Sequence, residues 1–198
     1  MTIGSQYGQD RILKMIFRDK HTGFVVEVGA ADGIDNSNSY MLLQRPHWGG
    51  ILIEPESSQF ALLQERYKNN NNVKCIRCAC GAHEGIHTLY RGGQVSTFKL
   101  ATKAAAEDMH NIKYEEEQVE IKTLQRVLTE NNAPTEIDYM SIDCEGMDRE
   151  VWGTLELDTY RPGLVCMEGK GHVMIGYQEL CRTPGNTFYL REDLCEAL

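Results

Sequence analysis

The stretch that decides the fold reads 23-GFVVEVGAADGIDNSNS-39. Residues 24–28 form a short, mostly apolar and β-branched run, which is typical of a strand buried on both faces of a parallel sheet. Gly29 and Gly33 follow with small residues between them, and glycine lets a backbone turn tightly and approach a ligand closely. The Asn and Ser residues after the glycines can cap a helix that starts near Ser39 and offers free N–H groups. Strand, glycine turn and helix start together predict a nucleotide-type cradle.

The glycine spacing distinguishes this turn from a dinucleotide-binding one. A dinucleotide fingerprint reads G-x-G-x-x-G, whereas this turn reads Glu27-x-Gly29-x-x-x-Gly33. The Glu27 carboxylate, at the carboxyl end of the strand, would repel a pyrophosphate and suits a cationic or hydroxylated ligand better. A glycine turn of an ordinary α/β domain, with a solvated glutamate, is the alternative that this stretch leaves open.

Glu54 stands at the end of a second predicted strand, over residues 48–55. It lies about 20 residues beyond Gly33, where a Rossmann-like fold places the carboxylate that accepts hydrogen bonds from ribose hydroxyls. The spacing alone fits a nicotinamide or an adenosylmethionine cofactor. Glu54 could instead cap the helix that follows Pro55.

A third strand is predicted over residues 73–80, after a helix that Ser57 caps and that runs to Lys68. The end of the third strand of a doubly wound sheet can lie against an adenine ring. Ala79 and Cys80 are therefore candidate lining residues.

A second informative stretch is 137-IDYMSIDCEG-146, which returns the chain to the sheet. Asp143 and Glu145 stand near the strand end, before a glycine and another helix. Because ligand chemistry gathers beyond the carboxyl ends of the strands in a doubly wound sheet, we expect both carboxylates to border the same crevice as Glu27 and Glu54.

Five pieces of the chain, in this order, resemble FkbM-type S-adenosylmethionine-dependent methyltransferases: 7-YGQD-10, 24-FVVEVGAADG-33, 37-SNS-39, 49-GGILIEP-55 and 141-SIDCEGMD-148. Each piece is moderately specific alone, and the ordered set covers most of the chain. The resemblance implies an α/β fold of the Rossmann-like class I methyltransferase type. Its sheet is seven-stranded and mostly parallel, with helices on both faces and a C-terminal antiparallel hairpin. Residues 176–180 and 187–191 supply that hairpin.

The resemblance also implies S-adenosylmethionine as the cofactor. It implies that Glu27 and the glycine backbone hold the amino-acid end of this cofactor, while the spacing places Glu54 on the ribose. The expected cofactor-binding residues are Glu27, Gly29, Ala30, Asp32, Gly33, Ser37, Asn38, Glu54, Pro55, Ala79, Cys80 and Asp143.

We predict methyl transfer to an oxygen nucleophile of a small molecule or glycan. A sulfonium methyl group is already activated, so the protein needs to align a hydroxyl with it and remove a proton. Asp143 and Glu145 are the candidate bases, and Glu168 and His172, at and after the strand predicted over 164–168, are a second set. A divalent metal on Asp143 and Glu145 could instead acidify the hydroxyl, although we do not predict one. Each of these residues could also serve only as a helix cap or an ion-pair partner.

One departure from the family pattern lies between the strand 164–168 and the hairpin. Only residues 169–175 separate them, so the usual helix is missing or reduced to a turn. Such a shortening would open one flank of the sheet near its substrate side. It could change the substrate, create a homodimer surface or mark a degenerate enzyme.

Chain length, net charge and cysteine content limit the domain number, the partners and the location of the protein. We expect a single domain over residues 1–198, with an N-terminal capping helix within 1–22 and a lid or insertion over 91–118. The net charge of −9 argues against nucleic acid and anionic membrane as partners. Seven cysteines without regular spacing favour reduced thiols, and no secretory or membrane-spanning segment is visible, so we expect a cytoplasmic protein.

Two other classes of protein remain open. A nicotinamide-dependent oxidoreductase would also use Glu54 on a ribose, but Glu27 and the spacing from Gly29 to Gly33 oppose it. A non-catalytic protein that keeps the fold and binds the cofactor without turning it over is the stronger rival, because of the shortened segment 169–175.

Overall fold

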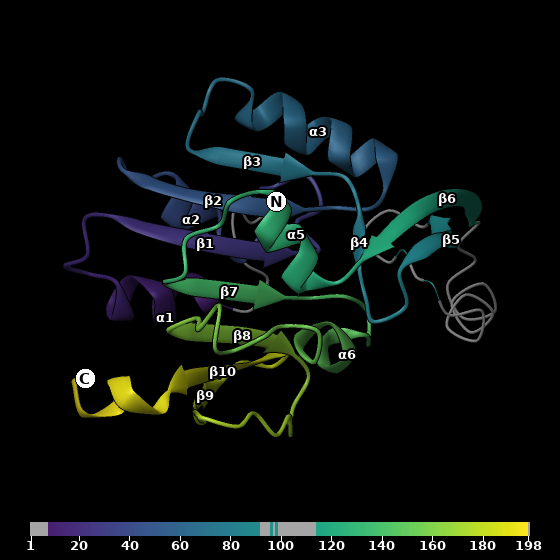
Figure 1. The fold of residues 1–198 in the computed structure, drawn as a ribbon. Helices are drawn as coiled ribbons and strands as arrows, with labels where there is room; N and C mark the ends of the chain where they lie inside the picture. The colour runs from purple at the N-terminus through teal and green to yellow at the C-terminus, as the bar shows by residue number, and fades with distance from the viewer. Residues whose placement is uncertain (1–7, 92–95, 97, 99–113, 198) are drawn as a thin grey trace.

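Seven strands form the central sheet in the order β3-β2-β1-β7-β8-β10-β9, as Figure 1 shows for the computed structural model. The structure describes residues 8–91, 96, 98 and 114–197. The strands are β1 (Gly23–Val28), β2 (Trp48–Ile53), β3 (Val73–Ile76), β7 (Tyr139–Ile142), β8 (Leu164–Glu168), β9 (Tyr177–Arg182) and β10 (Asn186–Arg191). The first five in the spatial order run parallel, whereas β10 is antiparallel to both β8 and β9. The predicted mostly parallel, seven-stranded sheet with a C-terminal hairpin is confirmed.

The strand β1 is buried on both faces, as its apolar run predicts. Val25 and Val26 belong to the apolar clusters on opposite faces of the sheet, and both are fully buried. β1 pairs in parallel with β2 on one side and with β7 on the other. Because parallel strands share one carboxyl edge, the residues that follow these three strands meet there.

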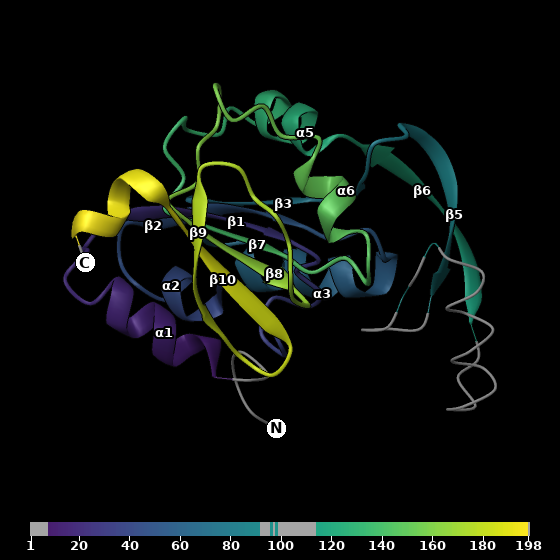
Figure 2. The ribbon, with the colours of Figure 1, turned by 90° about the horizontal axis from the view of Figure 1, so that it is seen from below.

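Helices cover both faces of the sheet, as Figure 2 shows. They are α1 (Gln9–Ile16), α2 (Tyr40–Leu43), α3 (Ser57–Tyr67), α5 (Leu124–Glu130) and α6 (Asp148–Trp152), followed by a 3₁₀ helix, η2 (Glu192–Ala197). The helices α1, α2 and α3 pack on the face that carries Val25, where Leu13 and Leu63 are fully buried. The helices α5 and α6 pack on the opposite face through Leu124 and Val151.

One helix start differs from the prediction. Glu56 is the N-cap of α3 and Ser57 is its first helical residue, so Ser57 does not cap this helix. The helix predicted near Ser39 does start there, at Tyr40. Its cap comes from the Asn and Ser cluster as expected, since Ser37 Oγ accepts the Tyr40 N–H at 3.1 Å, while the Ser39 hydroxyl donates to the Glu27 carboxylate. Thr123 caps α5, since its Oγ1 accepts the Arg126 backbone N–H of the first turn at 3.2 Å.

The strand predicted over residues 73–80 is broken in two. β3 ends at Ile76, and the chain then leaves the central sheet to form β4 (Ala79–Cys80). β4 pairs in parallel with β6 (Glu115–Lys122), which is antiparallel to β5 (Gly85–Arg91), and the three make a separate sheet. Ala79 is buried there in an apolar cluster with Leu89 and Ile121. Apolar packing within this second sheet accounts for the break.

The segment predicted as a lid, 91–118, ends in a strand rather than a loop. Residues 115–118 form the first half of β6. Glu117, the last of three consecutive glutamates at 115–117, is half-buried and forms ion pairs with Arg77 and Arg91. Residues 92–95, 97 and 99–113 of the segment lie outside the described residues, as does Tyr7 of the opening motif.

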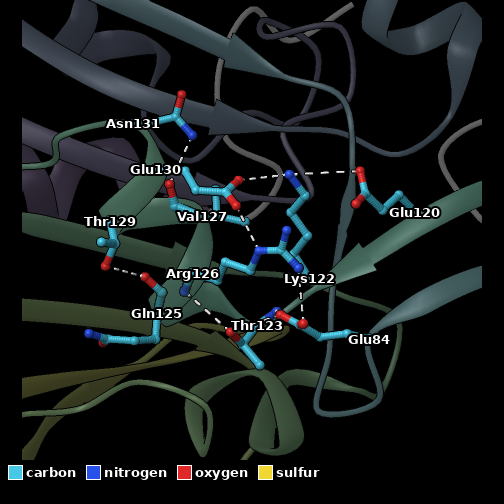
Figure 3. A network of polar contacts seen from close by, with 10 residues as sticks. All are labelled: Glu84, Glu120, Lys122, Thr123, Gln125, Arg126, Val127, Thr129, Glu130 and Asn131. Atoms are coloured by element: carbon cyan, nitrogen blue, oxygen red, sulfur yellow. Dashed lines mark hydrogen bonds and ion pairs between the residues drawn. The ribbon is translucent and has the colours of Figure 1, made fainter.

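A network of charged side chains ties the second sheet to α5, as Figure 3 shows. Lys122, the last residue of β6, lies 2.7 Å from the Glu130 carboxylate, and Arg126 lies 2.7 Å from the same group. Arg126 also contacts Glu84, in the turn before β5, at 3.0 Å. Exposed pairs of this kind contribute little individually. Together these ion pairs connect β6 and the turn before β5 to α5.

The connection between β8 and β9 contains no helix, as predicted. Residues 169–176, all of them described, follow an irregular path with Gly169, Gly171 and Gly176 at positive φ. Val173 and Ile175 are 79% and 86% exposed, so this flank of the sheet carries open apolar surface. Within the described ranges, no helix has the length and apolar character that crossing a bilayer requires.

Candidate functional site

A cavity lies beyond the carboxyl ends of β1, β2, β7 and β8, the edge to which their arrowheads point in Figure 1. Nine of the predicted site residues line it: Gly29, Ala30, Glu54, Pro55, Ala79, Cys80, Asp143, Glu145 and Glu168. Six others lie outside the lining: Glu27, Asp32, Gly33, Ser37, Asn38 and His172. The structure thus brings together the carboxyl groups predicted at the ends of β2, β7 and β8, but Glu27, which was expected to border the same crevice, does not line it.

Gly29 brings three strand ends into contact. The N–H groups of Gly29 and Ala30 both donate to the carbonyl of Ile53, the last residue of β2, at 3.0 Å. Gly29 has φ +83°, and a Cβ there would stand 2.0 Å from the carbonyl oxygen of Asp143. Only glycine fits so close to another backbone. The turn after β1 therefore packs against the β2 end, which carries Glu54, and the β7 end, which carries Asp143.

The Glu54 carboxylate is fixed on the cavity wall. The residue is 6% exposed, and its Oε2 and Oε1 accept the N–H groups of Ala31 at 2.9 Å and Glu56 at 2.8 Å. Burial raises the pKa of Glu54 to about 7, although these two hydrogen bonds lower it. The charges of Glu56 and Glu117 add to the rise. Each carboxylate oxygen keeps a second lone pair that can accept a ligand hydroxyl.

Glu27, at the carboxyl end of β1, is buried and binds the segment 37–39 through hydrogen bonds. It is 1% exposed and accepts the Ser37 hydroxyl at 2.9 Å, the Asn38 N–H at 2.6 Å and the Ser39 hydroxyl. Burial raises its pKa to about 6, although these hydrogen bonds oppose the rise. Both carboxylate oxygens are thus occupied within the protein. A direct contact between Glu27 and a ligand stays a prediction.

Asp32 and Gly33 shape the turn that reaches the cavity. Asp32 Oδ1 accepts two backbone N–H groups of the following residues, each at 2.9 Å. Gly33 has φ +78°, and a Cβ there would stand 2.6 Å from Leu63 Cδ1. Together they present Asp35 and Asn36, which line the cavity. For this Asn and Ser cluster the sequence analysis had indicated a helix cap and cofactor binding by Ser37 and Asn38, but it had named neither Asp35 nor Asn36.

Other lining residues had little or no signal in the sequence. Gln59 stands in the first turn of α3, which begins two residues after the predicted Pro55, and this position could have indicated it. Phe98 is an isolated aromatic residue in a segment of weak pattern. Leu89 lines the cavity because β5 belongs to the second sheet, and nothing in its own sequence indicates that.

Asp143, Glu145 and Glu168 form a second part of the wall. Burial raises the pKa of Asp143 to about 8, and the charges of Glu168, Asp148 and Glu145 add to the rise. Burial, with the charges of Glu168 and Asp148, raises the pKa of Glu145 to about 7. Burial and the Asp148 charge also raise the pKa of Glu168. Asp143 and Glu145 therefore retain protons near neutral pH, and a positive charge placed beside them would release those protons.

The turn after β7 holds Glu145 in a strained conformation. Glu145 has φ +51° and Gly146 has φ +86°. Asp148, buried at the start of α6, accepts the Cys144 N–H at 3.3 Å and fixes this turn. A non-glycine residue in the left-handed region costs on the order of 1 kcal/mol, and such strain clusters at functional sites. Here the strained residue lies on the cavity wall.

His172 lies near this wall without lining the cavity. Its ring Nε2 is 2.7 Å from the Glu168 carbonyl oxygen, and its backbone N–H donates to the Tyr189 hydroxyl at 3.2 Å. A role for His172 as a base stays a prediction. In the part of the chain that the structure describes, no group of His, Cys, Asp and Glu side chains has the arrangement of a metal site.

The lining fits a cationic adenosyl cofactor better than a dinucleotide. Glu54 offers lone pairs to hydroxyls, while Ile53, Ala79 and Leu89 offer apolar surface to a flat ring. The charged residues among the described lining are all acidic: Asp35, Glu54, Asp143, Glu145 and Glu168. A pyrophosphate would meet only negative charge here, whereas a sulfonium and an ammonium group would meet favourable charge.

Comparison with known proteins agrees with this geometry. A family model described as the methyltransferase FkbM domain matches residues 27–177. The solved structure of an FkbM methyltransferase from Methylobacillus flagellatus KT aligns with a TM-score of 0.55 at 13% identity, over 86% of this chain and 44% of that protein. The Escherichia coli protein yhhF, assigned to the methyltransferases, aligns with a TM-score of 0.55 at 12% identity, over 93% and 84%. At these identities the two structures support the fold alone. The chain spans less than half the length of the Methylobacillus protein, and no curated protein matches its sequence.

Proposed function

The chain belongs to the FkbM methyltransferase family, and from this premise we propose that it transfers the methyl group of S-adenosylmethionine to a hydroxyl oxygen of a small molecule or glycan. Membership of the family implies methyl transfer and S-adenosylmethionine as the donor. The oxygen nucleophile and the kind of acceptor are the finer part of the proposal.

The observation that carries the proposal is that Glu54 and Asp143 line one cavity, with Gly29 packed between their strand ends. Glu54 would accept hydrogen bonds from the ribose hydroxyls, and the backbone around Gly29 would hold the amino-acid end. Ala79 and Cys80 would lie against the adenine ring. This arrangement leaves the carboxylates at the ends of β7 and β8 for the reacting groups.

The protein's share of the chemistry is to orient a hydroxyl and to remove its proton. When bound, the cofactor supplies a methyl group that its sulfonium sulfur already activates. Asp143 is the base that we assign, because a carboxylate whose pKa lies near the working pH is the most effective proton acceptor. Glu145, Glu168 and His172 would orient the acceptor or serve as secondary bases.

The proposal is tested by incubating the protein with methyl-labelled S-adenosylmethionine and a panel of hydroxyl compounds, and by locating the label in any product. We expect a methyl ether. General base catalysis contributes roughly 100-fold or more, so Asp143→Asn should lower turnover by at least about that factor while the protein still binds S-adenosylhomocysteine. Asp19→Asn, at an exposed carboxylate near the N-terminus, is the matched control and should leave turnover unchanged.

A non-catalytic cofactor-binding protein is the second candidate, favoured by the shortened segment 169–176 and its exposed Val173 and Ile175. The same experiment separates the two. Binding of S-adenosylhomocysteine together with no labelled product across the panel would replace the enzyme with this candidate. A labelled amine or carbon product would retain the methyltransferase and refute the oxygen nucleophile.

A further inference from the structure

Fully ionised, the carboxyl groups of the cavity carry more negative charge than the donor can balance. Five of them line it, and its described lining includes no Lys, Arg or His. S-adenosylmethionine carries a sulfonium, an ammonium and a carboxylate, which leaves one net positive charge. Like charges in a partly buried site repel one another strongly because water screens them poorly, and protons on Asp143 and Glu145 relieve this repulsion in the free protein near neutral pH. A second positive group bound beside these carboxyls would replace those protons.

The unbalanced charge is concentrated at the ends of β7 and β8. Asp143, Glu145 and Glu168 lie there on the wall, and the buried Asp148 adds a fourth carboxyl close behind them. Each of the three wall residues feels the charge of Asp148, and Asp143 and Glu145 also feel that of Glu168. Glu54 lies at the end of β2, two strands away from β7 in the sheet, so the excess charge does not lie where the ribose is expected.

The protein supplies no cation to this wall from the residues that the structure describes. Lys170 and His172 follow Glu168 in the chain, but neither lines the cavity. The His172 ring contacts the carbonyl oxygen of Glu168. It lowers the pKa of Glu168 and of Asp148, but burial raises both by more. Among the His, Cys, Asp and Glu side chains that the structure describes, no group has the arrangement of a metal-binding site.

We propose that the methyl acceptor is a hydroxyl compound that also carries an ammonium group, which Glu145 and Glu168 bind while the hydroxyl faces Asp143. This inference rests on the proposed function, and it narrows the acceptor to a cationic class such as amino sugars and amino polyols. Anionic acceptors, including phosphorylated and carboxylated sugars, are excluded by the same charges. The strain at Glu145 is consistent with a side chain placed for binding.

The test uses three methyl glycosides of one ring that differ only in charge: the 2-amino-2-deoxyglucoside, the glucoside and the glucuronate. Each is titrated by calorimetry at pH 7, where the sugar amine is largely protonated, into the protein saturated with S-adenosylhomocysteine. A charge-assisted contact is worth roughly 1.5–3 kcal/mol, so the amino glycoside should bind at least about tenfold more tightly than the neutral one. The glucuronate should bind more weakly than both.

Glutamine variants test whether Glu145 and Glu168 are the residues that bind the ammonium group. Glu145→Gln and Glu168→Gln should each lower the preference for the amino glycoside at least about threefold, while the affinity for the neutral glycoside changes little. Glu65→Gln, at an exposed carboxylate of α3, should leave the preference unchanged. Binding of S-adenosylhomocysteine to every variant shows that each is folded.

The outcomes separate this inference from the proposed function. Equal or stronger binding of the neutral glycoside, no binding of any of the three, or a preference that neither glutamine variant lowers would overturn the cationic acceptor. Failure of the wild-type protein to bind S-adenosylhomocysteine would instead overturn the proposed function itself, and this inference with it.

Discussion

Raising the pH from 6 to 8 should tighten the binding of S-adenosylmethionine. In the free protein the pKa of Asp143 is raised to about 8 and those of Glu145 and Glu54 to about 7, in each case first by burial. A cationic ligand favours the ionised carboxylates and lowers their pKa, so its affinity follows the ionised fraction. The affinity should therefore rise with pH and level off above about pH 8.

The expected magnitude follows from Asp143. A carboxyl with a pKa of about 8 is roughly 1% ionised at pH 6 and half ionised at pH 8, which gives at most about a 50-fold gain for a ligand that requires the ionised form. The neighbouring carboxyls titrate together with Asp143, so their separate gains do not simply multiply. We expect an overall increase of about 10- to 50-fold. S-adenosylhomocysteine, which lacks the sulfonium charge, should gain only a few-fold.

Calorimetric titration at several pH values, in two buffers of different ionisation enthalpy, measures both the affinity and the protons released on binding. We expect net proton release at pH 7, and Asp143→Asn should remove most of the pH dependence. An affinity that stays constant or falls as the pH rises would refute the electrostatic reasoning. So would an unchanged slope in Asp143→Asn.

Three further predictions concern stability and the turn after β1. Because the folded-state pKa of Asp143 lies far above its ordinary value of 3.8, its stabilising contribution is complete below pH 3.8 and is lost as the pH rises through about 8. Asp143→Asn should thus stabilise the free protein against urea by roughly 3–4 kcal/mol more at pH 8 than at pH 5, and an equal effect at both pH values would contradict this. Gly29→Ala should cost about 2–4 kcal/mol and abolish cofactor binding. Gly8→Ala, with a similar φ of +84° but no described atom within 4 Å of the added Cβ, should cost about 1 kcal/mol, and equal losses would show that no clash with Asp143 exists. Thr123→Ala should lower the stability to urea by about 1 kcal/mol and leave the affinity for S-adenosylhomocysteine unchanged, and a weakened affinity would contradict this prediction.

The central sheet could be predicted because its signals are local. Val25 and Val26 belong to one continuous apolar run, and such a run is required of a strand that helices cover on both faces. Glu54 and Asp143 could be placed in one cavity for a similar reason, since each directly follows a parallel strand. Position in the sequence therefore specifies position at the carboxyl edge of the sheet.

The second sheet could not be predicted because its pairing is remote in the sequence. Ala79 pairs with Ile121, about 40 residues later, and no local pattern separates residues 79–80 from the strand before them. The hydrogen-bond partners of Glu27 could not be predicted either, because they depend on the path of the turn. Its carboxylate could bind a ligand or the Ser37 and Ser39 hydroxyls, and only the path of the turn decides between them.

The most direct test of the central claim is calorimetric titration of the protein with S-adenosylmethionine, S-adenosylhomocysteine and NAD, repeated with Glu54→Ala. The exposed Glu65 of α3 provides the control variant, Glu65→Ala. We predict that both adenosyl sulfur compounds bind, that Glu54→Ala weakens both at least about tenfold, and that NAD does not bind. Binding of NAD alone, or of none of the three, would contradict the account.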